Sequence, residues 1–164
     1  MLNNKVALIT GCDRGIGRAV MEKFAKNNAT IYAAARKKGS LDKIVNKLIS
    51  NHGVVITPVY FDMVDTEKLK KTFSEINNNH KRLDILVNNA GVMKDALIGM
   101  VTEKNMQDVF SVNVFALINS IQFAVKLMKR NKSGSIINIS SIVGKEGNPG
   151  QIVYSASKGA VISV

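Results

Sequence analysis

Short apolar runs rich in β-branched residues alternate along the chain with segments whose apolar residues recur every three or four positions. The first run covers residues 6–10, and after a glycine turn Ile16, Val20 and Phe24 follow at a spacing of four. Short apolar runs are typical of strands buried in a sheet, and the longer spacing is typical of helices that cover it. Alternation of the two predicts an α/β fold with a parallel sheet between two layers of helices.

The pattern predicts five strands and the helices between them. Strands are expected at residues 6–10, 30–33, 54–60, 84–88 and 135–140. Helices are expected to begin near residues 16, 41 and 65, and a long helix is expected over residues 102–130. The fifth strand leads into a predicted loop that ends at Tyr154, and a further helix begins there.

The long helix has apolar residues on more than one side. Phe110, Leu117 and Ala124 fall on one side, whereas Val114 and Val125 are turned away from it. A helix that is apolar nearly all round is buried on both sides. The second side is therefore covered either by other parts of the same chain or by another subunit, and the sequence favours neither.

Length and composition limit the domain count and the class of protein. The chain has 164 residues, 46% of them hydrophobic, which suffices for one domain over residues 1–164 and hardly for two. No uninterrupted apolar stretch reaches about 18 residues, which argues against a membrane-spanning helix. A single cysteine, Cys12, excludes an internal disulfide and a multi-cysteine metal site, so no metal is expected. No signal-peptide pattern follows the N-terminus, which predicts a cytoplasmic protein.

The net charge of +11 would suit nucleic-acid binding if the basic residues were gathered on one face. Lysines outnumber arginines 18 to 5 and are spread over the polar positions of the expected helices. Proteins that bind nucleic acid also tend to carry aromatic or arginine-rich elements, which are missing here. A solvated surface is favoured over a nucleic-acid site, although the positive field still favours an anionic ligand.

Three glycines lie between the first strand and its helix, in the segment Thr10-Gly11-Cys12-Asp13-Arg14-Gly15-Ile16-Gly17. Glycines here permit a tight turn and let backbone N–H groups approach a ligand, while the helix N-terminus favours a diphosphate. The spacing G-x-x-x-G-x-G matches neither the G-x-G-x-x-G fingerprint nor a Walker loop. Taken alone, the loop indicates either a dinucleotide site or a simple turn from strand into helix. Cys12 is expected there for its small size, not for redox chemistry.

Four further motifs follow this loop in order. Asn88-Asn89-Ala90-Gly91 follows the fourth strand, Asn113 lies in the long helix, Ser141 follows the fifth strand, and Tyr154-x-x-x-Lys158 comes last. Ser141 precedes Tyr154 by 13 residues, and Asn113 precedes it by 41. Together with the glycine loop, these motifs resemble the short-chain dehydrogenase/reductase family over residues 5–164.

The resemblance implies a Rossmann-like, doubly wound parallel sheet with strand order 3-2-1-4-5 and a nicotinamide dinucleotide as cofactor. It also implies four catalytic roles. Tyr154 donates a proton to the carbonyl oxygen as hydride arrives, and Lys158 also holds the nicotinamide ribose. Ser141 hydrogen-bonds the substrate oxygen, and Asn113 supports a water that relays protons to Lys158. The residues expected to contact the cofactor are Gly11, Asp13, Arg14, Gly15, Ile16, Gly17, Arg36, Asp62, Met63, Asn89, Ala90, Gly91, Tyr154 and Lys158.

The pairing of Tyr154 with Lys158 has a physical rationale. Residues four apart lie on one face of a helix, so the ammonium can sit close to the phenol. A nearby cation stabilises a phenolate over a phenol, which suits an acid–base catalyst. Each of the four catalytic candidates taken singly has an ordinary structural explanation, and only their joint spacing indicates a catalytic site.

The end of the second strand bears on the choice between NAD and NADP. An acidic residue there would hydrogen-bond the adenosine ribose, whereas a basic residue would pair with a 2′-phosphate. The strand ends at Arg36 with no acid, and Arg14 lies in the glycine loop, so NADP is expected over NAD. Asp13 runs against this expectation, because a carboxylate repels a phosphate unless it turns to a ribose hydroxyl. Asp62, followed by Met63, resembles the family's acid that contacts the adenine amino group, or else is a turn acid.

Residues 94–97 and 147–151 resemble the 3-oxoacyl-acyl-carrier-protein reductase branch of the family, an enzyme of fatty acid biosynthesis. This resemblance implies NADPH-dependent reduction of a 3-oxoacyl thioester to a 3-hydroxyacyl thioester, and a basic surface would suit an acidic carrier protein. Another short-chain alcohol or carbonyl dehydrogenase remains an alternative, because other branches share parts of these segments. Full-length relatives are expected to be dimers or tetramers, with neither a membrane nor a nucleic acid as partner.

The printed sequence ends ten residues after Tyr154, within the predicted helix and without a helix stop signal. The resembled family continues this helix and adds two strands, roughly 60 to 90 residues by ordinary element lengths. A C-terminally truncated domain is therefore expected, with its fifth strand as an open sheet edge. The alternative to an active enzyme is an inactive fragment that keeps only part of the cofactor site.

Overall fold

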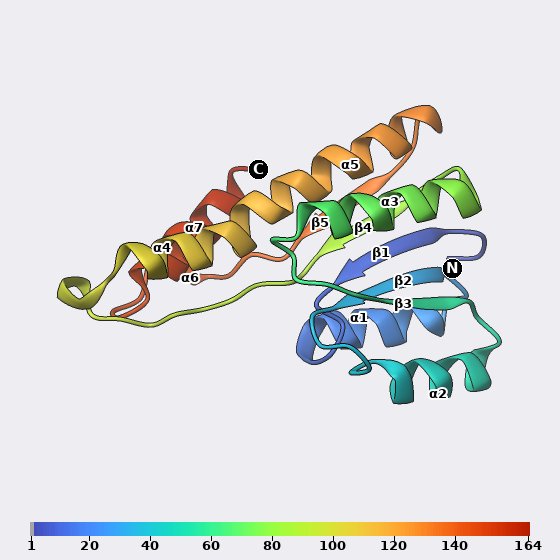
Figure 1. Ribbon diagram of the computed structural model, residues 1–164, viewed down its shortest axis with the longest axis horizontal. Helices are drawn as coiled ribbons and strands as arrows, with labels where there is room; N and C mark the ends of the chain where they lie inside the picture. The colour runs from blue at the N-terminus through green and yellow to red at the C-terminus, as the bar shows by residue number, and fades with distance from the viewer. Residues whose placement is uncertain (1) are drawn as a thin grey trace.

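Five parallel strands form a single sheet in the computed structural model, which describes residues 2–164 (Figure 1). They are β1 (Val6–Thr10), β2 (Thr30–Ala35), β3 (Ile56–Tyr60), β4 (Ile85–Asn88) and β5 (Ser135–Asn138). Their order across the sheet is β3-β2-β1-β4-β5, and each neighbouring pair is parallel. The predicted Rossmann-like, doubly wound topology is confirmed.

Seven α-helices and two shorter helical turns connect the strands within the described residues. The α-helices are α1 (Gly15–Ala25), α2 (Asp42–His52), α3 (Thr66–His80), α4 (Glu103–Phe110), α5 (Ala116–Arg130), α6 (Val143–Glu146) and α7 (Ile152–Ile162). The turns are a 3-10 helix, η1 (Ile98–Met100), and a π-helical turn, η2 (Ser111–Phe115), which joins α4 to α5. Figure 1 shows α1 and α2 below the sheet and α3 and α5 above it.

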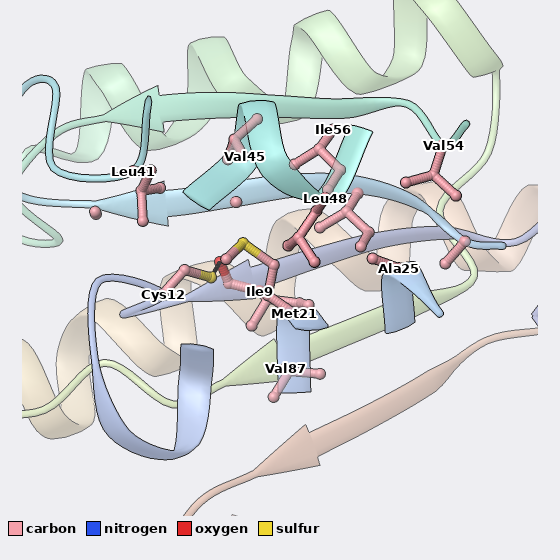
Figure 2. Close-up of a cluster of buried hydrophobic side chains, with 14 residues drawn as sticks. Ile9, Cys12, Met21, Ala25, Leu41, Val45, Leu48, Val54, Ile56 and Val87 are labelled. Carbon is pink, nitrogen blue, oxygen red and sulfur yellow. Dashed lines mark hydrogen bonds between the residues drawn. The ribbon is translucent and has the colours of Figure 1, made fainter. Parts of the chain in front are cut away.

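Two apolar clusters hold these layers together, one on each face of the sheet. Successive residues of β1 point to opposite faces. Ile9 packs with residues of α1 and α2, as Figure 2 shows with Met21 and Val45, whereas Leu8 belongs to the cluster with α3 and α5. All five residues of β1 are buried, as expected for the central strand of a sheet covered on both faces.

The structure corrects several expected boundaries. The second strand, β2, continues to Ala35, β4 begins at Ile85, and α7 begins at Ile152 and not at Tyr154. The structure also adds α6 and the turns η1 and η2.

The bounds of β3 and β5 differ from the expected ones as well. β3 begins at Ile56, because Gly53 ends α2 in the left-handed region with φ 64° and the chain must turn before it enters the sheet. β5 ends at Asn138. The segment expected to be a loop contains α6, which is too short to produce a visible apolar period. The expected single helix over residues 102–130 contains the π-helical turn η2.

The long helix is not buried all round within the described chain. Its inner side, including Leu117 and Ala124, is buried, but Phe115 is 57% exposed and Val125 is 45% exposed. Val114, which was expected on the second apolar side with Val125, is only 6% exposed, so the described residues cover that side in part. Residues Glu103–Arg130 are by length and composition apolar enough to cross a membrane, although an uninterrupted apolar stretch is absent from the sequence. Contacts with α3, β4 and α7 are those of a helix in the core of a domain.

Asp84 joins the N-terminal ends of β1 and β4 and is only 6% exposed. Its carboxylate accepts hydrogen bonds from the Val6 N–H and from Arg82 Nε, both at 2.9 Å, and Lys5 Nζ lies 3.5 Å away. Burial acts to raise the pKa of Asp84, but hydrogen bonds from Arg82 and Val6 and the charges of Arg82 and Lys5 outweigh it, so the pKa lies below its usual value. The ionised form therefore stabilises the fold.

Replacing Asp84 with asparagine is expected to lower the free energy of unfolding by about 2–3 kcal/mol at pH 7, because the buried Val6 N–H and the Arg82 guanidinium lose a charged acceptor. The folded-state pKa is depressed, so this stabilisation is present above the unfolded carboxyl pKa of about 3.9 and is lost as the pH falls below it. Urea unfolding between pH 7 and pH 3 measures both effects. Asp95→Asn, at an exposed position, is the matched control and should change stability by less than about 0.5 kcal/mol. Equal effects of the two substitutions would contradict the assignment.

Candidate active site

Two glycines of the predicted loop approach each other and the end of β4. Gly11 has φ +71°, which favours glycine, and its carbonyl faces Gly17. A Cβ on Gly17 would lie 2.2 Å from Gly11 O and 2.4 Å from Asn89 Nδ2, so no larger residue fits there without displacing backbone. The close approach lets α1 begin directly beside the ends of β1 and β4.

The Asn89 side chain and the Thr10 hydroxyl fix the loop to the end of β4. Asn89 Nδ2 donates to the carbonyl oxygens of Thr10 and Gly11, both at 3.0 Å. Thr10 Oγ1 accepts from the N–H groups of Asn89 and Ala90, both at 3.0 Å, and donates to Val87 O at 3.3 Å. These contacts explain physically why Asn-Ala-Gly follows β4. The role of the Thr10 hydroxyl in joining β1 to the end of β4 was not predicted. The only feature of the sequence that could have indicated it is a hydroxyl residue at the end of a buried strand.

A cavity of about 450 Å³ opens where these elements meet, at the C-terminal ends of the strands. This is the edge at which doubly wound sheets bind ligands, beside the point where the strand order reverses between β1 and β4. The predicted cofactor residues that line the cavity are Gly11, Asp13, Arg14, Gly15, Ile16, Arg36, Asp62, Met63, Asn89, Ala90 and Gly91. Lining residues that were not predicted are Ala34, Ala35, Phe61, Val92 and Val112.

The lining carries both signs of charge, with Arg14 and Arg36 on one side of the balance and Asp13 and Asp62 on the other. Arg14 precedes the first turn of α1, which holds no acidic residue, and its side chain is exposed. The partial positive charge of the α1 N-terminus points to the same space, because Gly15 and Ile16 line it. Asp62 lines the cavity and also accepts a hydrogen bond from the Val64 N–H at 3.2 Å, so its turn function is present whether or not it contacts a ligand.

Cys12 lies beside the cavity but faces the core. Its side chain is 0% exposed, and Sγ donates to Ile9 O at 3.1 Å. Burial, together with the nearby Asp13 charge, outweighs the hydrogen bond from the Ala34 backbone and raises the pKa of the Cys12 thiol to about 12. A buried, protonated thiol is unreactive, which agrees with the expectation of a small packing residue.

The π-helical turn η2 places Asn113 next to the cavity. Asn113 is 1% exposed, its Oδ1 accepts from the Val92 N–H at 2.8 Å, and its Nδ2 donates to Val92 O at 2.9 Å. The same Nδ2 donates to Ser157 Oγ at 3.0 Å. Turns of this kind often mark functional sites, because they redirect a side chain within a continuous helix. Here the turn ties the segment after Gly91 to α7.

Lys158 and Tyr154 lie on one face of α7, as predicted. Lys158 Nζ is 5.8 Å from the centre of the Tyr154 ring and donates to Ile139 O at 2.7 Å. A Cβ on Gly91 would lie 3.6 Å from Lys158 Nζ and 3.3 Å from Asn113 Oδ1. The predicted catalytic residues Lys158 and Asn113 therefore meet at Gly91, on the rim of the cofactor cavity. Burial lowers the pKa of the Lys158 ammonium.

Ser141 is half-buried and follows a segment that α7 holds in place. Ser140 Oγ donates to Lys158 O at 2.8 Å, and the Lys158 ammonium binds the carbonyl oxygen of Ile139. Ser141 O accepts from the Gly144 N–H at 3.0 Å, which starts α6. These two bonds tie residues 139–140, directly before Ser141, to α7. Ser140 and Ser157 were not predicted, because a lone serine near a motif carries no distinctive spacing.

A second cavity, of about 650 Å³, lies on the other side of α7 and includes none of the predicted site residues. Its lining is mainly apolar or glycine, with Leu97, Ile98 and Ile152 among the apolar residues. Among residues 2–164, no group of three or more His, Cys, Asp or Glu side chains could hold a metal ion.

Comparison with known proteins agrees with this geometry. A family model for short chain dehydrogenase matches residues 5–164. The chain is 39% identical over 163 residues to 3-oxoacyl-acyl-carrier-protein reductase FabG of Thermotoga maritima, covering 99% of this chain and 66% of that protein. It is 38% identical over 167 residues to the same reductase of Staphylococcus aureus, covering 100% of this chain and 67% of the relative. The chain thus spans about two thirds of the length of these relatives.

A solved structure is also similar. L-Sorbose reductase from Gluconobacter frateurii, complexed with NADPH and L-sorbose, superposes with a TM-score of 0.94 at 29% identity. The match covers 99% of this chain and 62% of that one. The family model, the relatives and the sheet order lead to the same assignment. The chain belongs to the short chain dehydrogenase family.

Proposed function

We propose that this chain supplies the cofactor site and the catalytic group of an NADPH-dependent carbonyl reductase. The observation that carries the proposal is the meeting of Lys158 and Asn113 at Gly91, because Gly91 also lines the cofactor cavity. A family motif on α7 and a dinucleotide cavity between β1 and β4 thereby form one continuous site. If the cofactor cavity and the α7 motif were separate sites, the nicotinamide and the proton donor could not act on one substrate.

The cavity residues fit a nicotinamide dinucleotide. A Cβ on Gly17 would fill the space in which α1 and the end of β1 approach each other. Glycine at this position therefore lets the backbone N–H groups at the start of α1 face a bound anion. The first turn of α1 and Arg14 suit a diphosphate. Arg36 at the end of β2 suits a 2′-phosphate, and no acid stands there to hold a ribose hydroxyl, so NADP is proposed over NAD. The L-sorbose reductase structure contains NADPH, which supports the same choice.

Each catalytic side chain is assigned one role in this proposal. When bound, the cofactor supplies the hydride for reduction of a carbonyl. Tyr154 donates a proton to the carbonyl oxygen, and Ser141 hydrogen-bonds that oxygen. The Lys158 ammonium, held at Ile139 O, lies beside the Tyr154 ring and is assigned the hydroxyls of the nicotinamide ribose. Asn113 holds the chain after Gly91 against α7 and supports proton relay to Lys158.

A 3-oxoacyl thioester is the proposed substrate. Relatives at 38 to 39% identity are named 3-oxoacyl-acyl-carrier-protein reductases, and the net charge of +11 suits an acidic carrier protein. The proposal places the protein in the cytoplasm and in fatty acid biosynthesis, as one Rossmann domain of a homo-oligomer. The exposed side of the long helix, with Phe115 and Val125, suits contact with another subunit.

A second candidate is reduction of a sugar-like ketone, because the similar solved structure is an L-sorbose reductase. Steady-state NADPH consumption, followed at 340 nm, distinguishes the two candidates. The proposal predicts faster turnover of an acetoacetyl thioester than of L-sorbose, and of NADPH than of NADH. Preference for L-sorbose would favour the second candidate. Binding of NADPH without turnover of either substrate would show that these residues form only the cofactor part of a site.

A further inference from the structure

The loop after β2 carries three consecutive cations, the first of which lines the cofactor cavity. Arg36, Lys37 and Lys38 are all exposed, and Arg36 lines the cavity. Three flexible cationic side chains on a mobile loop would lose much of their electrostatic benefit to conformational entropy. The way in which residues 36–41 are anchored therefore bears on how well they recognise a phosphate.

The far end of this loop is fixed at Leu41 and Tyr60. Leu41 is 0% exposed and belongs to the core cluster between the sheet, α1 and α2. Its backbone N–H donates to the Tyr60 hydroxyl at 3.2 Å. Tyr60 is the last residue of β3 and lies in register with Ala35, the residue directly before Arg36. The Tyr60 side chain thus connects the two ends of the cationic loop through the sheet.

The Tyr60 hydroxyl also holds the carboxylate closest in sequence to these cations. It donates to Asp42 Oδ1 at 2.5 Å. The other carboxylate oxygen, Oδ2, lies 3.6 Å from the place that a Cβ would take on Gly39, so Asp42 is adjacent to the loop. No ion pair among residues 2–164 involves Asp42. Its carboxylate is directed to Tyr60 and leaves the cations available to a ligand.

We propose that Tyr60 is a positioning residue for phosphate recognition, which holds the Asp42 carboxylate away from Arg36, Lys37 and Lys38. The inference rests on the proposed use of NADP. Without the hydroxyl, Asp42 can turn toward the loop and compete with the 2′-phosphate for the same cations. Tyr60 touches neither substrate nor cofactor in this role and acts through Asp42 and the loop.

The hydroxyl stays protonated over the range of ordinary assays. Burial and the hydrogen bond to Asp42 raise the pKa of Tyr60 above its usual value of about 10, despite the opposing hydrogen bond from the Leu41 backbone. A phenol that remains protonated keeps donating to the carboxylate. The geometry of the contact, with one donor and one acceptor bond on the same oxygen, fixes the direction of that proton.

The test compares two adenosine nucleotides that differ only in the 2′-phosphate. Dissociation constants for 2′,5′-ADP and 5′-AMP are measured by calorimetry with the wild-type chain and with Tyr60→Phe. Loss of the restraint on Asp42 is expected to weaken 2′,5′-ADP binding about tenfold, as for loss of a charge-assisted contact, and to change 5′-AMP binding less than about twofold. Tyr32→Phe is the matched control. Its hydroxyl accepts from Asn79 at 3.0 Å, away from the cavity, and both affinities should stay within about twofold.

An Asp42→Asn background separates the carboxylate effect from general loosening. There the Tyr60→Phe change is expected to weaken 2′,5′-ADP binding less than about threefold, because no charge remains to compete. An unchanged ratio of the two affinities in Tyr60→Phe overturns the inference, as does a full tenfold loss in the Asp42→Asn background. Thermal unfolding verifies that the variants fold. If the wild-type chain binds neither nucleotide, the proposed cofactor itself is wrong and the inference falls with it.

Discussion

Tyr154→Phe is expected to lower the rate of carbonyl reduction by about 10²- to 10⁴-fold, the usual contribution of a positioned proton donor. Phenylalanine keeps the ring beside Lys158 Nζ but has no proton to give to the carbonyl oxygen. Affinity for NADPH should change less than about twofold, because the cavity is lined by other residues. Single-turnover NADPH oxidation and fluorescence titration measure the two quantities.

The control for this substitution is again Tyr32→Phe, because Tyr32 is buried on β2 and its hydroxyl contacts only Asn79 on α3 among the described hydrogen bonds. That variant should keep the wild-type rate within about twofold. A Tyr154→Phe variant that retains the wild-type rate would show that Tyr154 is not the proton donor. A variant that loses both rate and nucleotide affinity would show that Tyr154 serves binding instead.

Gly17→Ala is the substitution expected to disturb the cofactor cavity most. A methyl group 2.2 Å from Gly11 O cannot be accommodated without moving α1 away from β1. We expect the free energy of unfolding to fall by about 2–3 kcal/mol, as for overpacking, and NADPH affinity to fall at least about tenfold. Denaturant unfolding and fluorescence titration measure the two effects.

Gly99→Ala provides a matched control for the glycine substitution. Gly99 lies in η1, and a Cβ there would meet no atom within 4 Å. Stability should change by less than about 0.5 kcal/mol and affinity should not change. If Gly17→Ala bound NADPH as tightly as Gly99→Ala, the close approach of α1 to β1 would not be what builds the site.

The sheet could be predicted from the chain because its strands carry strong local signals. The run at residues 6–10 is buried at every position, and burial on both faces requires a continuous apolar run. The same reasoning overextended β3 and β5, since a run of apolar residues does not reveal where ladder pairing begins or ends. At the start of β3, a left-handed Gly53 decides the boundary.

Features that depend on contacts distant in sequence could not be predicted. The turn η2 and the short helix α6 produce no separate period, because one lies inside a long helix and the other has four residues. Thr10 contacts Asn89 and Ala90 across about 80 positions, and neither motif alone reveals that contact. The order of the motifs indicated that Asn113 and Lys158 belong to one site, and both lie beside Gly91. It did not indicate Ser157, which links Asn113 to the Tyr154 carbonyl.

Transfer of deuterium from the cofactor to the substrate would show whether this chain reduces a carbonyl. The chain is mixed with an acetoacetyl thioester and with NADPH in which deuterium replaces the C4 hydrogen that is transferred as hydride. The product is analysed by mass spectrometry and NMR. We expect one deuterium at C3 of the 3-hydroxyacyl product with the wild-type chain and a loss of product formation with Tyr154→Phe. A 3-hydroxyacyl product without deuterium, or no product while NADPH remains bound, would contradict reduction by this chain.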